Sequence, residues 1–233
     1  MDQDEGLRIL AAREWLSKTP VEFQRTILAP SSWHRFEPGD PIQTAGPAEN
    51  GAMVGLASGI VELRSVLGRA DTPIMHYARP VFWFGYRPVV MGRRLHKVEA
   101  TAKTVVHLAR VPHADIKKIL NERPEWWQYF LQPAFFFADI ALNIAADFMI
   151  RDSERRCAAV LLRLGGRRFA GPDDDEPVDV FITQDELAGA ANLSRNSAGA
   201  ILKRLAKRGL VEIGYRAKIV CHPLALRAFV EQG

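Results

Sequence analysis

Apolar residues in the first half of the chain change from helical spacing to short runs and back again. Residues 7–28 carry apolar and charged side chains at helical spacing, with a break at Pro20. Residues 33–111 instead contain short runs rich in Val, Ile and Phe, separated by glycines and prolines, which is typical of antiparallel strands. Residues 112–121 return to a helical pattern. We therefore expect one or two N-terminal helices, an antiparallel β sandwich or roll, and a short closing helix.

A long apolar helix is predicted next, from about Pro124 to Ile150. Its apolar side chains recur at alternating spacings of four and three residues, which makes one continuous seam. A polar stripe that includes Asp139, Asn143 and Asp147 follows the same helix, so the helix is not expected to cross a membrane.

A helix with so many apolar residues must pack against other parts of the protein on more than one side. We expect the same helix of a second copy to pack against one of these sides. The residues expected at this dimer interface are Phe130, Phe137, Ala141, Ile144 and Phe148. The alternative is a central helix in the core of a monomer. Asp152 and Ser153 break the helical pattern and can cap a further helix that ends at Gly165-Gly166, so a domain boundary is expected near Asp152. An acidic loop with the sequence GPDDDEP follows at residues 171–177.

Two short helices and a hairpin are predicted between Thr183 and Val220. Thr183 and Glu186 have the T-x-x-E spacing of a capping box, which starts the first helix. Ser194 is a good N-cap for the second helix, Gly209 closes that helix, and Gly214-Tyr215 is expected to form the turn of the hairpin. This arrangement is a winged helix-turn-helix, whose second helix usually enters the major groove of DNA.

The two faces of this second helix differ in composition. Its apolar face is formed by Ala198, Ile201, Leu202 and Leu205. On the other face Gly199 has no evident packing role, although a mid-helix glycine costs about 1 kcal/mol. Close approach to a nucleic acid would explain it. An Arg can pair with guanine and an Asn with adenine, so Arg195 and Asn196 are expected to read bases. The other residues expected at the DNA interface are Thr183, Ser197, Lys203, Arg216 and Lys218, which would hold phosphates, and Ser194 at the helix start. The alternative is a solvated basic helix in some other α/β domain.

Basic charge is concentrated in the same segment. The chain has 31 Lys and Arg against 27 Asp and Glu, a net charge of +4, which alone says little about partners. Residues 194–218 hold seven basic residues against one acidic residue, Glu212. Cys157 and Cys221 are the two cysteines and form no CxxC pair, which fits a reducing cytoplasm. Cys157 is interpreted as a buried structural residue, with a redox switch as the alternative.

The segment ITQDELAGAANLSRNSAGAILKRL resembles the DNA-binding region of the Crp/Fnr family of bacterial transcription regulators, which has an I-T-x-x-E-[IL]-A…S-R-x-[ST]…L-x-L pattern. FEPGDPIQTAG and SGIVELRS are similar to the turns and strands of that family's cyclic-nucleotide-binding-like roll. The resemblance implies an α+β fold with an N-terminal antiparallel β roll (a double-stranded β-helix, jelly-roll-like) at residues 1–123. It implies a dimerisation helix at 124–151 and a winged helix-turn-helix at 152–233. It also implies a cytoplasmic homodimer that binds palindromic promoter DNA, with RNA polymerase as a further partner.

The chain departs from this resemblance where the nucleotide-binding members hold their effector. Those members have a Gly-Glu followed by an Arg-Ser pair, whereas this chain has Gly85-Tyr86 and His96-Lys97. Cyclic AMP is therefore not expected to bind in the usual way. The residues expected around the effector pocket are Trp83, Phe84, Tyr86, His96 and Lys97. Aromatic side chains either fill this pocket or line a site for an apolar or aromatic effector.

No metal or other cofactor is expected. The chain lacks the N-terminal cysteine cluster of the oxygen-sensing branch of the family, and a lone His76, His96 or His107 is a weak indication of haem. No P-loop, G-x-S-x-G or HExxH motif is present, so an enzyme is not expected. The rival hypothesis is a ligand or haem sensor whose winged helix mediates protein contacts.

Overall fold

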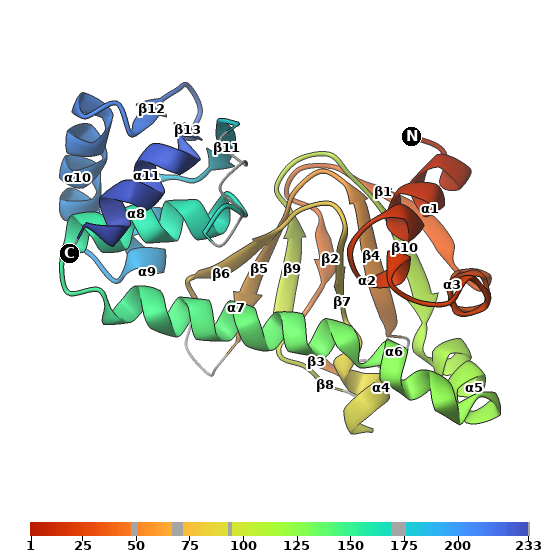
Figure 1. Ribbon diagram of the computed structural model, residues 1–233. Coiled ribbons are helices and arrows are strands. Elements are labelled where there is room, and N and C mark those ends of the chain that lie inside the picture. Colours follow the sequence, from red (N-terminus) through yellow and green to blue (C-terminus); the bar gives the residue numbers. More distant parts are fainter. Residues whose placement is uncertain (48–50, 67–71, 93–94, 169–175, 233) are drawn as a thin grey trace. The chain divides into compact units, whose positions relative to one another are not determined.

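Two compact units make up the protein. The computed structural model describes residues 1–47, 51–66, 72–92, 95–168 and 176–232 (Figure 1). The first unit comprises Met1–Ala70 and Ala78–Asp139, and the second comprises Asp71–Tyr77 and Ile140–Gly233. The predicted acidic loop at 171–177 falls largely outside the described residues.

Helices precede and follow the strands of the first unit, as the sequence predicts. The predicted break at Pro20 is confirmed, because this residue caps the third helix. The helices are α1 (Gln3–Ala12), α2 (Glu14–Ser17), α3 (Val21–Leu28), α4 (Arg87–Met91), α5 (His113–Glu122), the 3-10 turn η1 (Pro124–Trp126) and α6 (Trp127–Phe130). The strands are β1 (Ser32–Phe36), β2 (Pro41–Gln43), β3 (Gly46–Pro47), β4 (Ala52–Ser58), β5 (Val61–Ser65), β7 (Phe82–Phe84), β8 (Leu95–His96), β9 (Val98–Ala102) and β10 (Val106–Pro112). Strand β6 (Ile74–Ala78) lies at the division between the units.

Antiparallel pairing joins these strands. One sheet has the order β1-β10-β4-β7, strands β2, β9 and β5 are neighbours in a second sheet, and β3 pairs with β8. Trp33 lies opposite Ala109 in the first sheet, and Leu63 lies opposite Ala100 in the second. Residues 52–57 of β4 are all buried, which is why this strand reads as a continuous apolar run in the sequence. The predicted α+β fold with N-terminal antiparallel sheets is confirmed.

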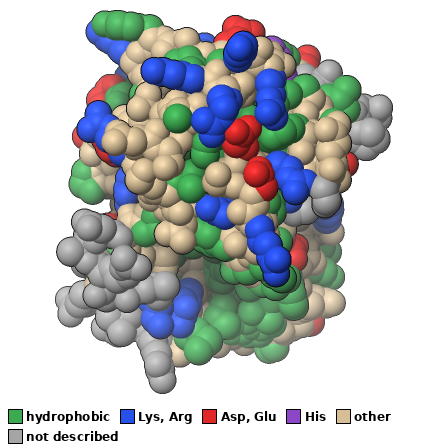
Figure 2. Space-filling model, turned by 90° about the vertical axis from the view of Figure 1, so that its left-hand side faces the viewer, with side chains coloured by type: hydrophobic (Ala, Val, Ile, Leu, Met, Phe, Trp, Pro, Cys, Tyr) green, Lys and Arg blue, Asp and Glu red, His purple; other side chains and the backbone are tan. Residues whose placement is uncertain are grey.

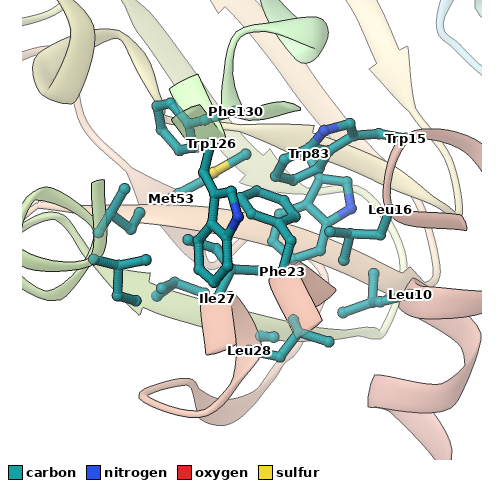
Figure 3. Close-up of a cluster of buried hydrophobic side chains, with 14 of the residues drawn as sticks. Leu10, Trp15, Leu16, Phe23, Ile27, Leu28, Met53, Trp83, Trp126 and Phe130 are labelled. Carbon is teal, nitrogen blue, oxygen red and sulfur yellow. The ribbon is translucent and has the colours of Figure 1, made fainter. Parts of the chain in front are cut away.

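Aromatic side chains hold the N-terminal helices against the first sheet (Figure 3). The ring of Trp15 meets that of Trp83 edge to face at 5.2 Å, and Phe23 meets Trp126 in the same way at 5.5 Å. Each such pair contributes about 0.5–1.5 kcal/mol beyond the area it buries. Phe130 is fully buried in the same cluster. Because the core of its own chain encloses this side chain, Phe130 is not available to the dimer surface predicted for it.

The long helix α7 (Gln132–Met149) runs from the first unit into the second. Its predicted polar stripe is not uniformly exposed: Asp139 is exposed, whereas Asp147 is 1% exposed. The Asp147 carboxylate accepts a hydrogen bond from Arg163 Nε at 2.8 Å and another from Arg168 Nε at 3.1 Å. This ion pairing attaches the C-terminal half of α7 to the residues that follow it. The compact units likewise divide after Asp139, within α7, rather than near Asp152.

Loss of the Asp147 carboxylate is expected to be strongly destabilising. Burial lowers the pKa of the Arg163 guanidinium, the hydrogen bond and charge of Asp147 oppose that shift, and Arg163 also donates to the Met75 carbonyl oxygen. Asp147→Ala leaves this buried cation without its carboxylate partner, so the free energy of unfolding should fall by about 3–5 kcal/mol. Urea denaturation followed by circular dichroism measures the change. The exposed control Asp139→Ala on the same helix should cost under about 0.5 kcal/mol, and equal losses from both variants would contradict this account.

The remaining helices and strands of the second unit follow α7, and among them are the predicted helix after Asp152, the two helices of the helix-turn-helix and the hairpin. They are α8 (Ser153–Leu164), β11 (Val178–Phe181), α9 (Gln184–Ala191), α10 (Arg195–Lys207), β12 (Val211–Ile213), β13 (Lys218–Cys221) and α11 (Pro223–Glu231). Asp152 caps α8 as predicted, since its side chain accepts a hydrogen bond from Arg155 N. The distant segment Asp71–Tyr77 joins this unit through Tyr77, whose hydroxyl donates to the Phe181 carbonyl oxygen at 2.7 Å. Nothing in the local pattern of the sequence predicts that attachment.

Candidate nucleic-acid interface

Side-chain caps fix both helices of the predicted helix-turn-helix. Thr183 Oγ1 accepts a hydrogen bond from Glu186 N at 3.1 Å, and the Glu186 carboxylate accepts one from Thr183 N at 2.7 Å, so the capping box is complete. Asn192 ends α9 with a left-handed φ of 53°, a conformation that asparagine tolerates. Ser194 Oγ then caps α10 by accepting from Ser197 N at 3.1 Å. The predicted starts of both helices are confirmed.

Helix α10 buries one face and exposes the other. The buried residues include the four predicted from the spacing, Ala198, Ile201, Leu202 and Leu205. Arg195, Asn196 and Ser197 are exposed at the N-terminal end, and Lys203 is exposed further along the helix. Thr183 and Ser194 are not among the buried residues either. These residues therefore lie where a bound duplex could reach them. Several of them are close to the N-terminus of α10, and the partial positive charge of a helix N-terminus attracts anions such as phosphates.

Gly199 corrects one interpretation of the sequence. It is buried rather than part of a bare outer surface. A Cβ atom at this position would lie 2.7 Å from Oε1 of Gln184 on α9, so the Gln184 side chain covers the glycine. Ala200 is the small residue that remains exposed on α10.

Arg195 does not lie free in the structure. Its Nε lies 3.3 Å from Oδ1 of Asp185 on α9, and both side chains are mostly exposed. An exposed pair of this kind contributes at most about 1 kcal/mol, so a guanine or a phosphate can displace the carboxylate. Asp185 was not among the predicted site residues, because its approach to Arg195 depends on the angle between the two helices.

The hairpin after α10 turns within residues 214–217. Gly214 N donates to the Lys218 carbonyl oxygen at 2.8 Å, and Lys218 N donates to the Tyr215 carbonyl oxygen at 3.3 Å. The corner residues are Arg216 and Ala217, with φ of 53° and 59°, as in the mirror-image turns that favour glycine and asparagine. Gly214 and Tyr215 therefore lie in the loop of the hairpin, as predicted, and the left-handed corner falls on the two residues after them.

This turn presents Arg216 at the tip of the hairpin. Its guanidinium lies 5.4 Å from the centre of the Tyr215 ring, which is 82% exposed. Lys218, the other predicted phosphate contact on the hairpin, pairs with Asp179 of β11 at 2.7 Å. Tyr215 is thus an exposed aromatic side chain beside two predicted contacts, and the sequence pattern did not single it out as a contact.

Basic side chains are spread over the face of the molecule that carries α10 (Figure 2). Two of them are held by a carboxylate: Glu154 of α8 lies 2.5 Å from Arg204 Nε and 3.5 Å from Arg208. Lys203 and Lys207 are exposed on the same helix. The carboxylate of Glu154 thus neutralises only part of the positive charge on α10. The remaining positive charge favours binding to a polyanion such as DNA.

The seam predicted on α7 coincides only in part with the exposed apolar surface. Phe137 packs edge to face against Phe82 at 5.3 Å and Tyr86 at 5.7 Å, so it contacts its own unit. Ile144 is half-buried, whereas Ala141 and Phe148 are exposed. One exposed apolar stripe, spaced by three and four residues, consists of Phe135, Ala138, Leu142, Ala145 and Met149. We call this set the α7 seam; Leu142 is 67% and Met149 81% exposed within it.

The helical stretch Pro124–Met149 is also long and apolar enough to cross a membrane, by length and composition only. Of its most apolar window, 17% is buried within the chain. Asp139 and the ion-paired Asp147 lie within this stretch. Charged side chains are costly in a bilayer, which weighs against a span.

A cleft of about 180 Å³ contains four of the five predicted effector-pocket residues, Phe84, Tyr86, His96 and Lys97. Arg87 and Phe137 also line it. Trp83 does not, because it belongs to the aromatic core and lines a separate cleft. The predicted group is therefore divided between two sites.

Charge in this cleft comes from Arg87 and Lys97. Burial lowers the pKa of His96 and of the neighbouring His113, which favours their neutral forms at pH 7. Burial also raises the pKa of Tyr86 to about 12, so its phenol stays protonated. Among the described residues, no cluster of three or more His, Cys, Asp or Glu side chains could hold a metal ion. Burial raises the pKa of the Cys157 thiol to about 12, which disfavours the reactive thiolate.

Comparisons with known proteins agree with the helix-turn-helix and with the fold described above. Residues 155–229 match the family model of the Crp-like helix-turn-helix domain. The structure of the regulator CLP from Xanthomonas campestris, described as c-di-GMP-responsive, aligns over 87% of this chain and 99% of its own, with 18% identity and a TM-score of 0.66. FixK2 from Bradyrhizobium japonicum aligns over 87% and 98%, with 14% identity and a TM-score of 0.67. A CRP/FNR family transcriptional regulator from Thermus thermophilus aligns over 86% and 99%, with 24% identity and a TM-score of 0.61. No curated protein matches the sequence.

Proposed function

The chain has the fold of the CRP/FNR transcription regulators and carries a Crp-like helix-turn-helix domain at residues 155–229, and from this we propose that it regulates transcription as a homodimer on an inverted repeat in promoter DNA. The observation that carries the proposal is the exposed polar and basic face of α10, which begins at Arg195 and Asn196 beside a capped helix start. Arg195 and Asn196 read bases, and Lys203 contacts the phosphate backbone. Arg216 and Lys218 extend the phosphate contacts from the hairpin.

Dimerisation through the α7 seam supports the proposed inverted repeat. A stripe with a three-four repeat is the pattern by which two helices pack along their length. Two copies related by a two-fold axis present two α10 helices to successive major grooves, with half-site centres about 10 base pairs apart. The same pairing removes from water the large apolar side chains that the single chain leaves exposed. A membrane would also cover them, but it would have to accommodate Asp139.

The cleft around Tyr86 is the proposed effector site on the sensory side of the protein. Tyr86 stands where the nucleotide-binding relatives in the Crp/Fnr resemblance have a glutamate, and a protonated phenol replaces the carboxylate that would accept from a ribose hydroxyl. We infer that cyclic AMP is not bound in the usual way. Arg87 and Lys97 favour an anionic effector.

The expected setting is the cytoplasm, with promoter DNA and RNA polymerase as partners and without a cofactor or a catalytic activity. The second candidate function is a ligand sensor whose winged helix contacts another protein. It would share the effector cleft but would show no preference among DNA sequences.

Selection of bound duplexes from random-sequence DNA by the full-length protein tests the proposal. We expect recovery of an inverted repeat with half-site centres about 10 base pairs apart, and an affinity that falls as salt rises. Recovery of duplexes without a shared sequence, with or without small anions present, would contradict the regulator proposal and favour the sensor hypothesis.

A further inference from the structure

A second cleft, distinct from the one around Tyr86, lies within the first unit. It has a volume of about 250 Å³ and is formed by α2, β7 with the residue before it, and the start of α7. Helix α7 contributes residues spaced three, four and seven apart, namely Gln132, Phe135, Phe136 and Asp139. One continuous face of α7 therefore forms a wall of this cleft.

Five aromatic side chains line the cleft, namely those of Trp15, Phe82, Trp83, Phe135 and Phe136. Trp15 and Trp83 belong to the cluster of buried side chains shown in Figure 3, and Phe136 meets Phe82 edge to face at 5.5 Å. Gly55 of β4 leaves room for the Trp83 ring, because a Cβ there would lie 2.6 Å from Cη2 of that ring. The floor is thus held in place by packing before any ligand arrives.

The indole N–H of Trp83 has no hydrogen-bond acceptor among the described residues, although the side chain is 95% buried. The neighbouring Trp15 differs, since its Nε1 donates to the Tyr129 carbonyl oxygen at 2.7 Å. Buried indole N–H groups usually find a partner. Trp83 is also one of the residues that line the cleft, so a ligand bound there could supply the missing acceptor.

The polar side chains of this cleft are unevenly charged. Glu14 and Asp139 contribute two carboxylates against the single ammonium of Lys18. Glu14 also adopts a left-handed φ of 55°, a conformation that a non-glycine residue rarely adopts and that often accompanies a binding site. The excess of negative charge favours a cationic ligand.

We propose that this cleft binds a small aromatic amine that also carries a hydrogen-bond acceptor. The aromatic walls stack on the ring and attract the cation, the carboxylates of Glu14 and Asp139 pair with the ammonium, and Trp83 donates to the acceptor. Phe135 belongs both to this cleft and to the α7 seam, so occupancy alters the stability of the dimer. That last consequence alone rests on the proposed homodimer; the binding site does not.

The test compares three probes of similar shape on the full-length protein: tyramine, its neutral analogue 4-(2-hydroxyethyl)phenol, and the anion 3-(4-hydroxyphenyl)propionate. Calorimetry is expected to rank the cation about tenfold above the neutral probe and the anion lowest. In ¹⁵N spectra the indole N–H signal of Trp83 should move on titration, while that of Trp33 stays. Assignment of the Trp83 signal uses Trp83→Phe.

The double variant Glu14→Gln/Asp139→Asn should abolish the preference for the cation. Glu122→Gln, an exposed charge on α5, is the matched control and should retain it. Equal affinity for all three probes, or binding that leaves the Trp83 signal in place, would overturn the proposal. DNA binding is measured on the same preparations, so failure of this site is distinguishable from failure of the regulator function.

Discussion

Leu142→Glu is expected to convert the protein into a monomer and to remove its tight binding to DNA. Leu142 lies at the middle of the α7 seam and is 67% exposed in the single chain. A symmetric dimer buries it twice, and each leucine contributes about 1.5–3 kcal/mol when it leaves water. Glutamate adds two like charges to that interface. The dimer dissociation constant should rise at least about 100-fold, measured by sedimentation equilibrium.

The matched control for this experiment is Leu224→Glu. Leu224 is an exposed leucine on α11, outside the α7 seam, and is 51% exposed. This variant should remain a dimer and bind DNA like the unaltered protein. If the unaltered protein is a monomer, or if Leu142→Glu dimerises as well as the control, the seam is not the interface. Recovery of the unaltered protein with membranes would instead favour a lipid-bound helix.

Arg195→Ala is expected to remove sequence discrimination while leaving general DNA affinity nearly intact. A bidentate contact between arginine and guanine contributes about 1–3 kcal/mol of discrimination, and a dimer makes two. Affinity for the selected repeat should therefore fall at least about 30-fold. Binding to unrelated DNA should change little, because the phosphate contacts remain. Fluorescence anisotropy with both duplexes measures the two affinities.

Lys218→Ala provides the contrasting result. Its ammonium is a predicted phosphate contact, so its loss should weaken selected and unrelated duplexes by a similar factor and reduce the salt dependence by about two phosphate contacts, one for each subunit. Dimerisation should survive in both variants. An Arg195→Ala protein that keeps its full ratio of specific to unspecific affinity would show that base reading lies elsewhere on the surface.

Local hydrogen bonding explains why the helix-turn-helix could be predicted from the sequence. The caps at Thr183, Ser194 and Asp152 join residues three positions apart, so each is readable in a short window. The apolar face of α10 follows from its period for the same reason. These features do not depend on how distant segments meet.

The corrected predictions about α7, Gly199 and Asp147 depend on contacts between residues that are distant in the sequence. The period of α7 revealed repeated apolar positions, yet it could not say which stripe would pack on the chain itself; Phe137 faces Phe82 and leaves Phe135 outside. Gly199 was misinterpreted because its neighbour, Gln184, lies on another helix. Asp147 read as part of a polar stripe because its arginine partners follow 16 and 21 residues later.

The effector pocket was predicted least well, also because it depends on contacts between distant segments. A run of aromatic residues in β7 suggested one pocket, but the structure assigns Phe84 to the cleft around Tyr86 and Trp83 to the aromatic core. Neighbouring side chains on a strand point to different sides, so the assignment depends on which segments cover each side.

The most direct test of the central claim is a competition titration of the purified full-length protein, at physiological salt, between the selected inverted repeat and a scrambled duplex of equal length and composition. A sequence-specific homodimeric regulator should prefer the repeat by a factor of about 1,000 or more. Equal affinity for the two duplexes would contradict the account.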